Sequence, residues 1–200
     1  MPKQIILLTG DTEFPVLSKA LLAANESLEV LHANSASALS QEMKSSDPGS
    51  VRLLSFSSNV IVPAAVLNAL RGPAYNFHPG PPEYPGSHPD SFAIYEGATR
   101  FGATVHEMVA AVDAGSIVQV SEFDIPEGVD ALELATLAYQ HIAAMFFDLA
   151  PVLASTDEDL PRIDRRWGAR KGTRADYEKM RNFDEEMDIA ELTLRKRAFG

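Results

Sequence analysis

Short apolar runs alternate, along the first 78 residues, with segments in which apolar residues recur every three or four positions. A short apolar run is typical of a buried strand, and apolar residues at helical spacing predict a helix with one buried face. The pattern predicts strands over residues 4–10, 28–33, 51–57 and 74–78 and helices over residues 14–25 and 62–70. Both helices carry an early proline, which favours a first helical turn. Strands that alternate with helices indicate an α/β fold with a doubly wound, mostly parallel sheet.

The pattern changes after residue 78. Residues 79–90 read PGPPEYPGSHPD, and the five prolines predict a rigid loop that folds over the sheet edge. The expected elements that follow are a short helix over 90–97, strands over 102–109 and 116–125 joined by a tight loop at 111–115, and a helix over 131–149. The Ser-rich span 35–50 is expected to be an irregular excursion.

A second change in composition occurs near residue 154. Long apolar runs become rare, and the segment from Arg162 to Arg174 carries six basic residues. We therefore expect a main domain over residues 1–154 and a C-terminal extension or small subdomain over residues 155–200, with a final helix from about residue 190.

Composition excludes several classes of function. The formal net charge of −11 argues against a general nucleic-acid surface, which needs clustered Lys and Arg. The absence of cysteine excludes disulfides, thiolate chemistry and cysteine-ligated metals. The apolar run at the N-terminus is shorter than a signal-peptide core, and the pattern shows no membrane helix of about 20 apolar residues. We expect a cytoplasmic protein with no membrane partner.

Two side chains at the end of the fourth expected strand have catalytic chemistry. Asn76 and His78 are two positions apart, so in a strand they point to the same face, at the edge where α/β sheets bind ligands. A carboxamide can donate to a developing oxyanion, and an imidazole can transfer a proton near neutral pH. Asp113 could orient the imidazole if its loop folds back. By spacing alone a structural role for these residues is the simpler interpretation, because all three types are common in turns.

Four motifs favour a catalytic role for these three residues over a structural one. They are N-F-H-P-G at residues 76–80, Y-P-G at 84–86, G-A-T-V-H at 102–106 and V-D-A-G at 112–115. In this order and spacing they resemble the folate-dependent formyltransferases, a family that includes glycinamide ribonucleotide transformylase, methionyl-tRNA formyltransferase and the sugar N-formyltransferases. The resemblance is strongest over residues 51–127 and implies a Rossmann-like formyltransferase domain.

The resemblance implies a catalytic trio of Asn76, His78 and Asp113. The implied reaction moves a formyl group from 10-formyltetrahydrofolate to an amine, without a metal. In that reaction Asn76 and His78 would stabilise the oxyanion, while Asp113 would hold His78 and assist removal of the amine proton.

The resemblance also implies where the two substrates bind. The folate would lie against the loops at residues 54–61 and 108–113, which makes Phe56, Ser57 and Val109 the expected cofactor-binding residues.

On the amine side we expect His88 and Tyr84, together with Arg165 and Arg166 if the amine carries phosphate. Tyr84 could equally anchor its loop, and the basic run could be solvated surface. Trp167 either anchors the extension on the core or stacks on a base.

Three other histidines remain. His106 lies on an expected strand, and we expect it to have a structural role, with support of the folate or of Asp113 as the alternative. His32 and His141 are expected to pack in the protein or to lie on its surface.

The chain also differs from the family pattern. It reads H-P-G-P-P-E where the family usually reads H-P-S-L-L-P, and fewer residues precede Asn76, so one strand–helix unit is expected to be reduced.

The sequence therefore predicts an N-formyltransferase that acts on a small amine, preferably a nucleotide-linked amino sugar. One alternative is a 10-formyltetrahydrofolate hydrolase, although there is no room for the regulatory domain of those enzymes before Ile5. The other is a non-catalytic folate- or nucleotide-binding module. A transfer-RNA substrate is less favoured, because those members carry a basic C-terminal barrel and this chain is acidic and stops at Gly200. The oligomeric state is left open, with a homodimer as one option.

Overall fold

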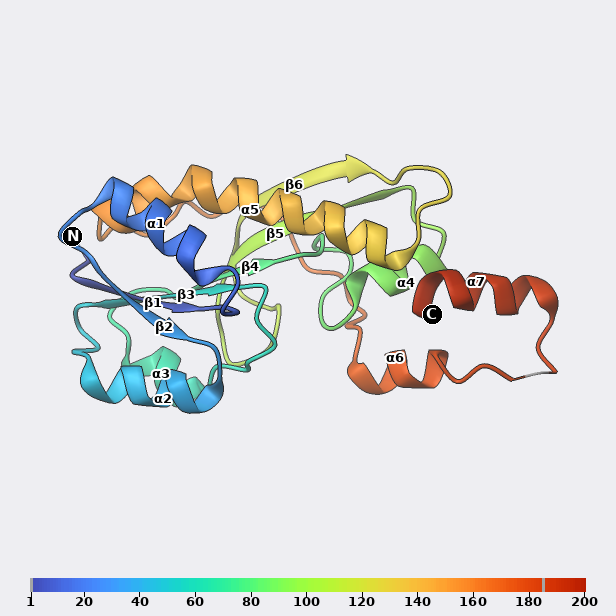
Figure 1. Cartoon of the computed structure of the whole chain (residues 1–200), viewed down its shortest axis with the longest axis horizontal. Helices are drawn as coiled ribbons and strands as arrows, with labels where there is room; N and C mark the ends of the chain where they lie inside the picture. Colours follow the sequence, from blue (N-terminus) through green and yellow to red (C-terminus); the bar gives the residue numbers. More distant parts are fainter. Residues whose placement is uncertain (1, 185) are drawn as a thin grey trace.

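The computed structural model describes residues 2–184 and 186–200 and contains a six-stranded sheet with the strand order β2-β1-β3-β4-β5-β6 (Figure 1). The first four strands run parallel, whereas β5 is antiparallel to both β4 and β6. The predicted α/β fold with a mostly parallel sheet is therefore confirmed. The strands are β1 (Gln4–Leu8), β2 (Glu29–Ala33), β3 (Val51–Phe56), β4 (Tyr75–His78), β5 (Arg100–Glu107) and β6 (Ile117–Asp124).

Helices cover both faces of the sheet, with α1 and α5 on one side and α2 and α3 on the other (Figure 1). The remaining helices, α4, α6 and α7, lie toward the end of the molecule opposite the N-terminus. The helices are α1 (Phe14–Ala24), α2 (Ala36–Ser45), α3 (Ala64–Ala69), α4 (Pro89–Tyr95), α5 (Ala131–Ser155), α6 (Arg174–Met180) and α7 (Ile189–Phe199). Each of the three strand–helix units before β4 has its strand and its helix, and α3 is the shortest of these helices.

Strand β1 shows why the sheet is covered on both sides. Successive side chains point to opposite faces, so Ile5 and Leu7 join the core under α1 and α5, while Ile6 and Leu8 join the core over α2 and α3. All four side chains are fully buried. Burial of each contributes about 1.5–3 kcal/mol, which fixes β1 in the centre of the fold.

The Ser-rich span is helical where the sequence interpretation expected an irregular segment. Helix α2 begins after Ser35, whose hydroxyl accepts a hydrogen bond from the Ala38 N–H at 3.2 Å. Serine is favoured at this capping position, and Leu39 of the same helix is buried against the sheet. The expectation was wrong because serines that begin a helix were read as loop residues.

Helix α5 extends beyond its predicted end at residue 149 and continues through Pro151 to Ser155. It begins with a capping box between Asp130 and Glu133. At its other end the buried guanidinium of Arg52 donates to the carbonyl oxygens of Leu153 and Thr156, at 2.7 and 2.9 Å. These charged hydrogen bonds satisfy carbonyls that a helix end leaves unpaired.

By length and composition alone, α5 is also apolar enough to cross a membrane, with a mean hydropathy of 1.3 over its most apolar window. Ile142, Phe146 and Leu153 on its inner side pack into the core against the sheet and α1. The same composition is expected of a core helix, so the helix by itself is weak evidence for a membrane.

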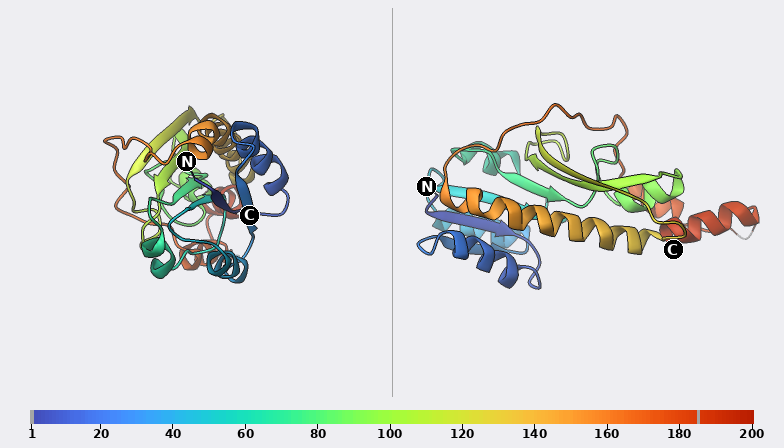
Figure 2. Two further views of the ribbon diagram at one scale, coloured as in Figure 1. Left: turned by 90° about the vertical axis from the view of Figure 1, so that its left-hand side faces the viewer. Right: turned by 90° about the horizontal axis from the view of Figure 1, so that it is seen from above.

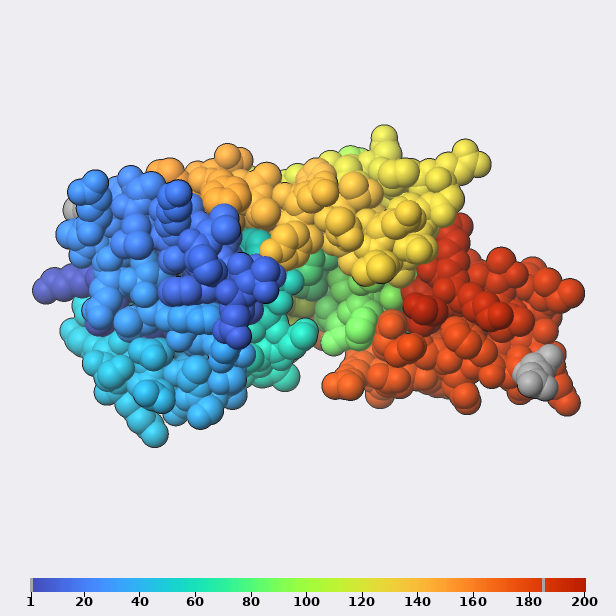
Figure 3. All heavy atoms as spheres, viewed as in Figure 1, coloured from blue at the N-terminus to red at the C-terminus, as the bar shows by residue number. Residues whose placement is uncertain are grey.

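The chain after α5 reaches the far end of the molecule by an extended path, which we call the C-terminal strap (residues 156–173). Figure 2 shows this segment passing over the strands β4 to β6 before it reaches α6. Helix α7 then packs on α4, where Phe199 meets Phe92 with ring centroids 5.6 Å apart. Figure 3 shows the N-terminal residues at one end of the molecule and the residues after the strap at the other.

Candidate active site

Three polar side chains gather at the edge where β4 ends. Asn76 and His78 share one face of β4, and the antiparallel register places His106 of β5 directly opposite Asn76. Directly opposed residues of two antiparallel strands point to the same face, so the pairing brings these side chains together.

Asp113 reaches the same place from the loop between β5 and β6. Its backbone is left-handed, with φ 43°, and its Oδ2 atom accepts a hydrogen bond from the Gly86 N–H at 2.7 Å. The loop has therefore folded back as the sequence interpretation required. It also links the Asp113 carboxylate to the Pro-rich loop that follows β4.

The distances define one buried cluster, which we call the reactive cluster (Asn76, His78, His106 and Asp113). His106 Nε2 lies 3.2 Å from Asp113 Oδ1, and His78 Nδ1 lies 3.7 Å from Asp113 Oδ2. The Asn76 Nδ2 atom lies 3.1 Å from His106 Nε2. The 3.7 Å separation is too long for a hydrogen bond, so Asp113 faces His78 as a charge.

His106 is the best-connected member of the cluster. Its Nδ1 atom lies 2.8 Å from the Glu107 carbonyl oxygen, so this nitrogen carries a proton and donates. The Nε2 atom then has two partners: without a proton it accepts from Asn76, and with a proton it donates to the Asp113 carboxylate. His106 therefore supports Asn76 in one protonation state and Asp113 in the other. This role fits the supporting function considered from the sequence.

Asp113 is held as a carboxylate. Burial would raise its pKa, but the neighbouring His78, the contact with His106 and the Gly86 N–H outweigh burial and lower the pKa well below its usual range. The hydrogen bond from Gly86 is short and persists whatever the charge on the two histidines. The cluster therefore contains a fixed negative charge at neutral pH.

Burial lowers the pKa of His78, and the opposing attraction of Asp113 only partly compensates. The imidazole is therefore neutral at neutral pH, which suits a proton acceptor better than a cation that stabilises an oxyanion. Its Nε2 atom is buried, and among the residues that the structure describes it has no hydrogen-bond partner.

Gly80 leaves room for the imidazole of His78. A Cβ atom at this position would lie 2.6 Å from His78 Nε2 and 2.8 Å from Pro89. Any larger residue here would displace the imidazole and also press on Pro89. The observed position of His78 therefore depends on glycine at residue 80.

A cavity of about 800 Å³ opens over the reactive cluster. We call Ser55 and the lining residues of segments 57–62 and 108–112 the donor arm, and the lining residues of segments 86–90 and 174–181 the acceptor arm. The volume suits a drug-sized ligand with room for a second small group. All four residues of the reactive cluster also line the cavity.

The donor arm contains two of the three predicted cofactor-binding residues. Ser57 and Val109 line the cavity, whereas Phe56 is fully buried and packs on Phe77 and Phe146. Side chains alternate along β3, so Phe56 points to the α5 face, and Ser55 lines the cavity instead. The strand alternation in the sequence was the signal that would have excluded Phe56.

The acceptor arm contains His88 as predicted, Arg174 from the predicted basic run, and two residues that the sequence interpretation did not select, Tyr177 and Arg181. His88 has a left-handed backbone, and its ring stacks on Tyr177 with centroids 3.6 Å apart and planes inclined by 10°. Arg174 and Arg181 also line this arm. Arg174 belonged to the basic run in the sequence, but nothing in the pattern placed α6 beside His88.

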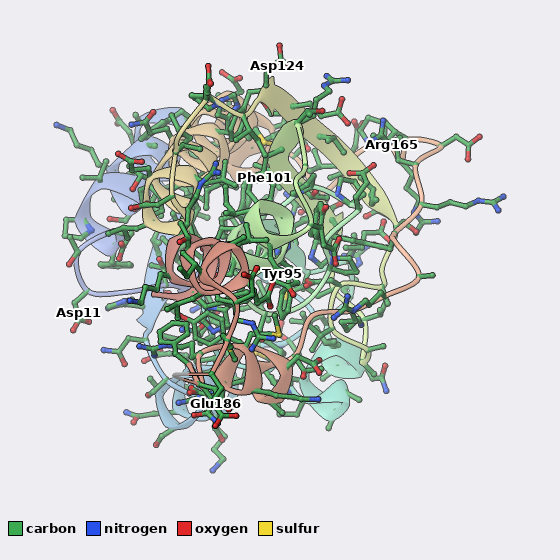
Figure 4. The ribbon with its side chains drawn as sticks, turned by 90° about the vertical axis from the view of Figure 1, so that its right-hand side faces the viewer. Asp11, Tyr95, Phe101, Asp124, Arg165 and Glu186 are labelled. Atoms are coloured by element: carbon green, nitrogen blue, oxygen red, sulfur yellow. The ribbon has the colours of Figure 1, made fainter. Side chains whose placement is uncertain are left out.

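The other predicted substrate residues lie elsewhere. Tyr84 is not among the residues that line the large cavity; its ring packs near Phe101, with centroids 6.3 Å apart, so it anchors its loop. Arg165 donates to Glu83 and Glu122 on the outer side of the strap, where Figure 4 shows it at the rim of the molecule. Arg166 is exposed on the same segment and does not line the cavity either. The structure therefore does not bring this arginine pair to the site.

Among residues 2–184 and 186–200, no group of three or more His, Asp or Glu side chains has an arrangement that could hold a metal ion.

The other two histidines both make ring stacks: His32 packs on Phe14 and His141 on Phe123. The ring stacks of His32 and His141 agree with the packing role expected from the sequence.

Sequence comparison identifies the family to which this fold and site belong. The chain belongs to the formyl transferase family, whose model matches residues 19–143. It is 36% identical over 107 residues to a methionyl-tRNA formyltransferase from Chlamydia caviae, a match that covers 48% of this chain and 33% of that protein. The chain spans about a third of the length of the curated relatives it matches.

Solved structures share the fold over almost the whole chain. A sugar N-formyltransferase from Shewanella sp. has a TM-score of 0.77 at 17% identity, and the match covers 96% of this chain and 85% of that one. An N-formyltransferase from Helicobacter canadensis, in complex with folinic acid and dTDP-3-aminofucose, has a TM-score of 0.73 at 16% identity, covering 100% and 81%. At these identities the likeness establishes the fold.

Proposed function

We propose that this protein transfers a formyl group from 10-formyltetrahydrofolate to the amine of a small, phosphorylated acceptor such as a nucleotide-linked amino sugar. The observation that carries the proposal is the cavity of about 800 Å³, which is lined by the donor arm, by the acceptor arm and by Asn76, His78 and Asp113. A donor and an acceptor bound against these two sets of residues would share the cavity that holds both a proton acceptor and an amide donor.

The reaction balances with the groups present. The amine nitrogen bonds to the formyl carbon, the bond from that carbon to N10 of the folate breaks, and one proton passes from the amine to the released tetrahydrofolate. Asn76 donates its amide N–H to the oxygen that gains charge. His78, neutral because burial lowers its pKa, accepts the amine proton, and the fixed charge of Asp113 stabilises the imidazolium that results.

The residues of the donor arm fit a folate. Ser55, Ser57 and the backbone of residues 57–62 offer hydrogen-bonding groups, and Val109 and Ile61 offer exposed apolar surface. A flat heterocycle needs this combination of polar edge and apolar contact. The folinic acid bound by the Helicobacter canadensis protein supports a folate donor here.

The acceptor arm fits an anionic, phosphorylated amine. Arg174 and Arg181 offer two guanidinium groups beside the carboxylates of Asp90 and Glu178, and Glu178 lies 3.7 Å from Arg174. A phosphate would take the place of Glu178 as the partner of Arg174, and the stacked His88 and Tyr177 rings form an aromatic wall. The dTDP-sugar bound by the Helicobacter canadensis protein supports this class. The acidic charge disfavours a long polyanion such as transfer RNA.

Direct titration with folinic acid, followed by formyl-transfer assays over a panel of nucleotide-linked and free amines, tests the proposal. We expect folinic acid to bind and one or more phosphorylated amines to gain a formyl group. Binding without transfer to any amine would identify a non-catalytic module. Release of formate without an acceptor would identify a hydrolase, and no binding of folinic acid would overturn the proposed donor.

A further inference from the structure

The C-terminal strap fastens both loops that surround the reactive cluster. On the Pro-rich loop, the Gly168 N–H donates to the Pro82 carbonyl at 2.7 Å, and the Gly172 N–H donates to the Pro85 carbonyl at 2.8 Å. On the Asp113 loop, the Trp167 Nε1–H donates to the Gly115 carbonyl at 2.8 Å, and the Lys171 ammonium donates to the Val112 carbonyl. The strap therefore joins the two loops that hold the reactive cluster.

The contact with the Pro-rich loop depends on close approach of two backbones. Gly86 and Gly172 form a parallel bridge, and a Cβ atom on Gly86 would lie 2.1 Å from the Gly172 carbonyl oxygen. Gly86 is also the residue whose N–H holds Asp113. The strap thus fixes the backbone group that fixes the catalytic carboxylate.

Trp167 is the strap residue that touches the reactive cluster itself. Its ring centroid lies 4.9 Å from that of His106, with the planes at 89°, and 6.0 Å from that of His78, with the planes at 72°. Both are edge-to-face arrangements, which are the favourable geometries for aromatic rings. Of the two interpretations considered from the sequence, the structure favours the anchor on the core, because the indole is already occupied by two histidines and a backbone carbonyl.

We propose, building on the proposed function, that Trp167 is a positioning residue for formyl transfer, which holds His106 and His78 at Asp113 and keeps water from the cluster. The C-terminal strap is then a part of the reactive centre.

Two physical effects support this role. The indole fills the space beside His106, so the imidazole stays where its Nε2 atom reaches both Asn76 and Asp113. By covering His78 the indole also contributes to the burial that keeps this imidazole neutral. A small displacement of a reacting group lowers the rate steeply, and so does entry of water.

The test compares Trp167→Leu and Trp167→Phe with Phe183→Leu, which changes a half-exposed aromatic residue of the same C-terminal region and serves as the matched control. We expect Trp167→Leu to lower kcat by about tenfold or more with nearly unchanged KM values for both substrates. The acid limb of its pH–rate profile should move to higher pH, since water beside His78 raises the pKa of that imidazole. Trp167→Phe keeps an aromatic ring and should recover most of the rate.

A shifted pH profile separates positioning from simple loss of stability. If Trp167→Leu lowers Tm but keeps kcat and the pH profile of the folded protein unchanged, the proposal is wrong. It is equally wrong if Phe183→Leu produces the same loss of kcat.

A second readout does not depend on activity. Trp167 is the sole tryptophan, so its fluorescence reports on the cluster without labelling. Loss of the His106 ring exposes the indole to water, so we expect the emission maximum of His106→Gln to lie at longer wavelength than that of the wild type. Identical maxima in the wild type and His106→Gln would overturn the contact, whereas a shifted maximum in a protein that transfers no formyl group would contradict only the proposed function.

Discussion

The reactive cluster and the acceptor arm lie side by side in one cavity but differ in burial. His78, His106 and Asp113 have side chains that are at most 8% exposed, whereas the Arg174 side chain is 84% exposed. A charge interaction in the buried cluster is weakly screened, while one at the exposed rim is reduced by water and salt. The two regions of the cavity are therefore expected to have different roles. The buried cluster should determine the rate of the chemical step, and the exposed rim formed by the acceptor arm should determine the affinity for the acceptor.

The largest expected effect is at the centre of the cluster. Asp113→Asn removes the fixed charge at nearly constant volume, so we expect kcat to fall by about 10² or more while the fold is retained. Turnover and Tm should be compared with those of Asp124→Asn, which removes an exposed carboxylate from the edge strand β6. A folded, fully active Asp113→Asn protein would remove Asp113 from the mechanism.

A change that leaves every charge in place should have the next largest effect. Gly80→Ala introduces a methyl group 2.6 Å from His78 Nε2, so the imidazole must move, and we expect kcat to fall by roughly tenfold. Gly72→Ala is the control, because its new methyl group would meet only Asp159, at 3.8 Å. Equal kcat values in the two variants would mean that the position of His78 tolerates displacement.

At the rim, the double variant Arg174→Gln and Arg181→Gln should raise KM for a phosphorylated acceptor severalfold with little change in kcat, as expected when uniform binding is lost. The effect should weaken as salt is added. The control removes the same two charges through Arg165→Gln and Arg166→Gln, which lie outside the cavity. If the control raises KM as much as the test pair, the effect comes from the overall charge of the protein.

The smallest expected effect concerns stability in acid. The lowered pKa of Asp113 contributes stability above the ordinary aspartate pKa of 3.8, and this contribution is lost as the pH falls through the still lower folded-state pKa. The stability difference between the wild type and Asp113→Asn should therefore shrink as the pH falls below about 4. Urea unfolding of both proteins at several pH values measures this difference in the free energy of unfolding. A difference that stays constant with pH would show that folding does not favour the carboxylate form of Asp113.

The strands of the sheet and the shared face of Asn76 and His78 could be predicted from the sequence, because both depend on local patterns. The apolar strands before Asn76 and the spacing of Asn76 and His78 follow directly from strand periodicity. The motifs then supplied Asp113, which no local rule would have joined to them.

The other features of the site could not be predicted, because they depend on contacts between segments that lie far apart in the sequence. Arg165 and Arg174 both belong to a basic run, but only the path of the strap shows that Arg165 pairs with Glu83 and Glu122 and that Arg174 lines the cavity. The stack of His88 on Tyr177 joins residues 89 positions apart, and no periodicity predicts such a pair. For Ser35 the capping rule was available, and the helix it begins could have been predicted.

Single-turnover formyl transfer, measured against acceptor concentration, tests the central claim of divided tasks most directly. The wild type, Asp113→Asn and the pair Arg174→Gln and Arg181→Gln would be compared with saturating 10-formyltetrahydrofolate and an amine that supports transfer. The account predicts that Asp113→Asn lowers the saturating rate at an unchanged half-saturating concentration, while the arginine pair raises that concentration at an unchanged saturating rate. If both variants changed the same parameter, the division between a buried reactive cluster and a binding rim would be contradicted.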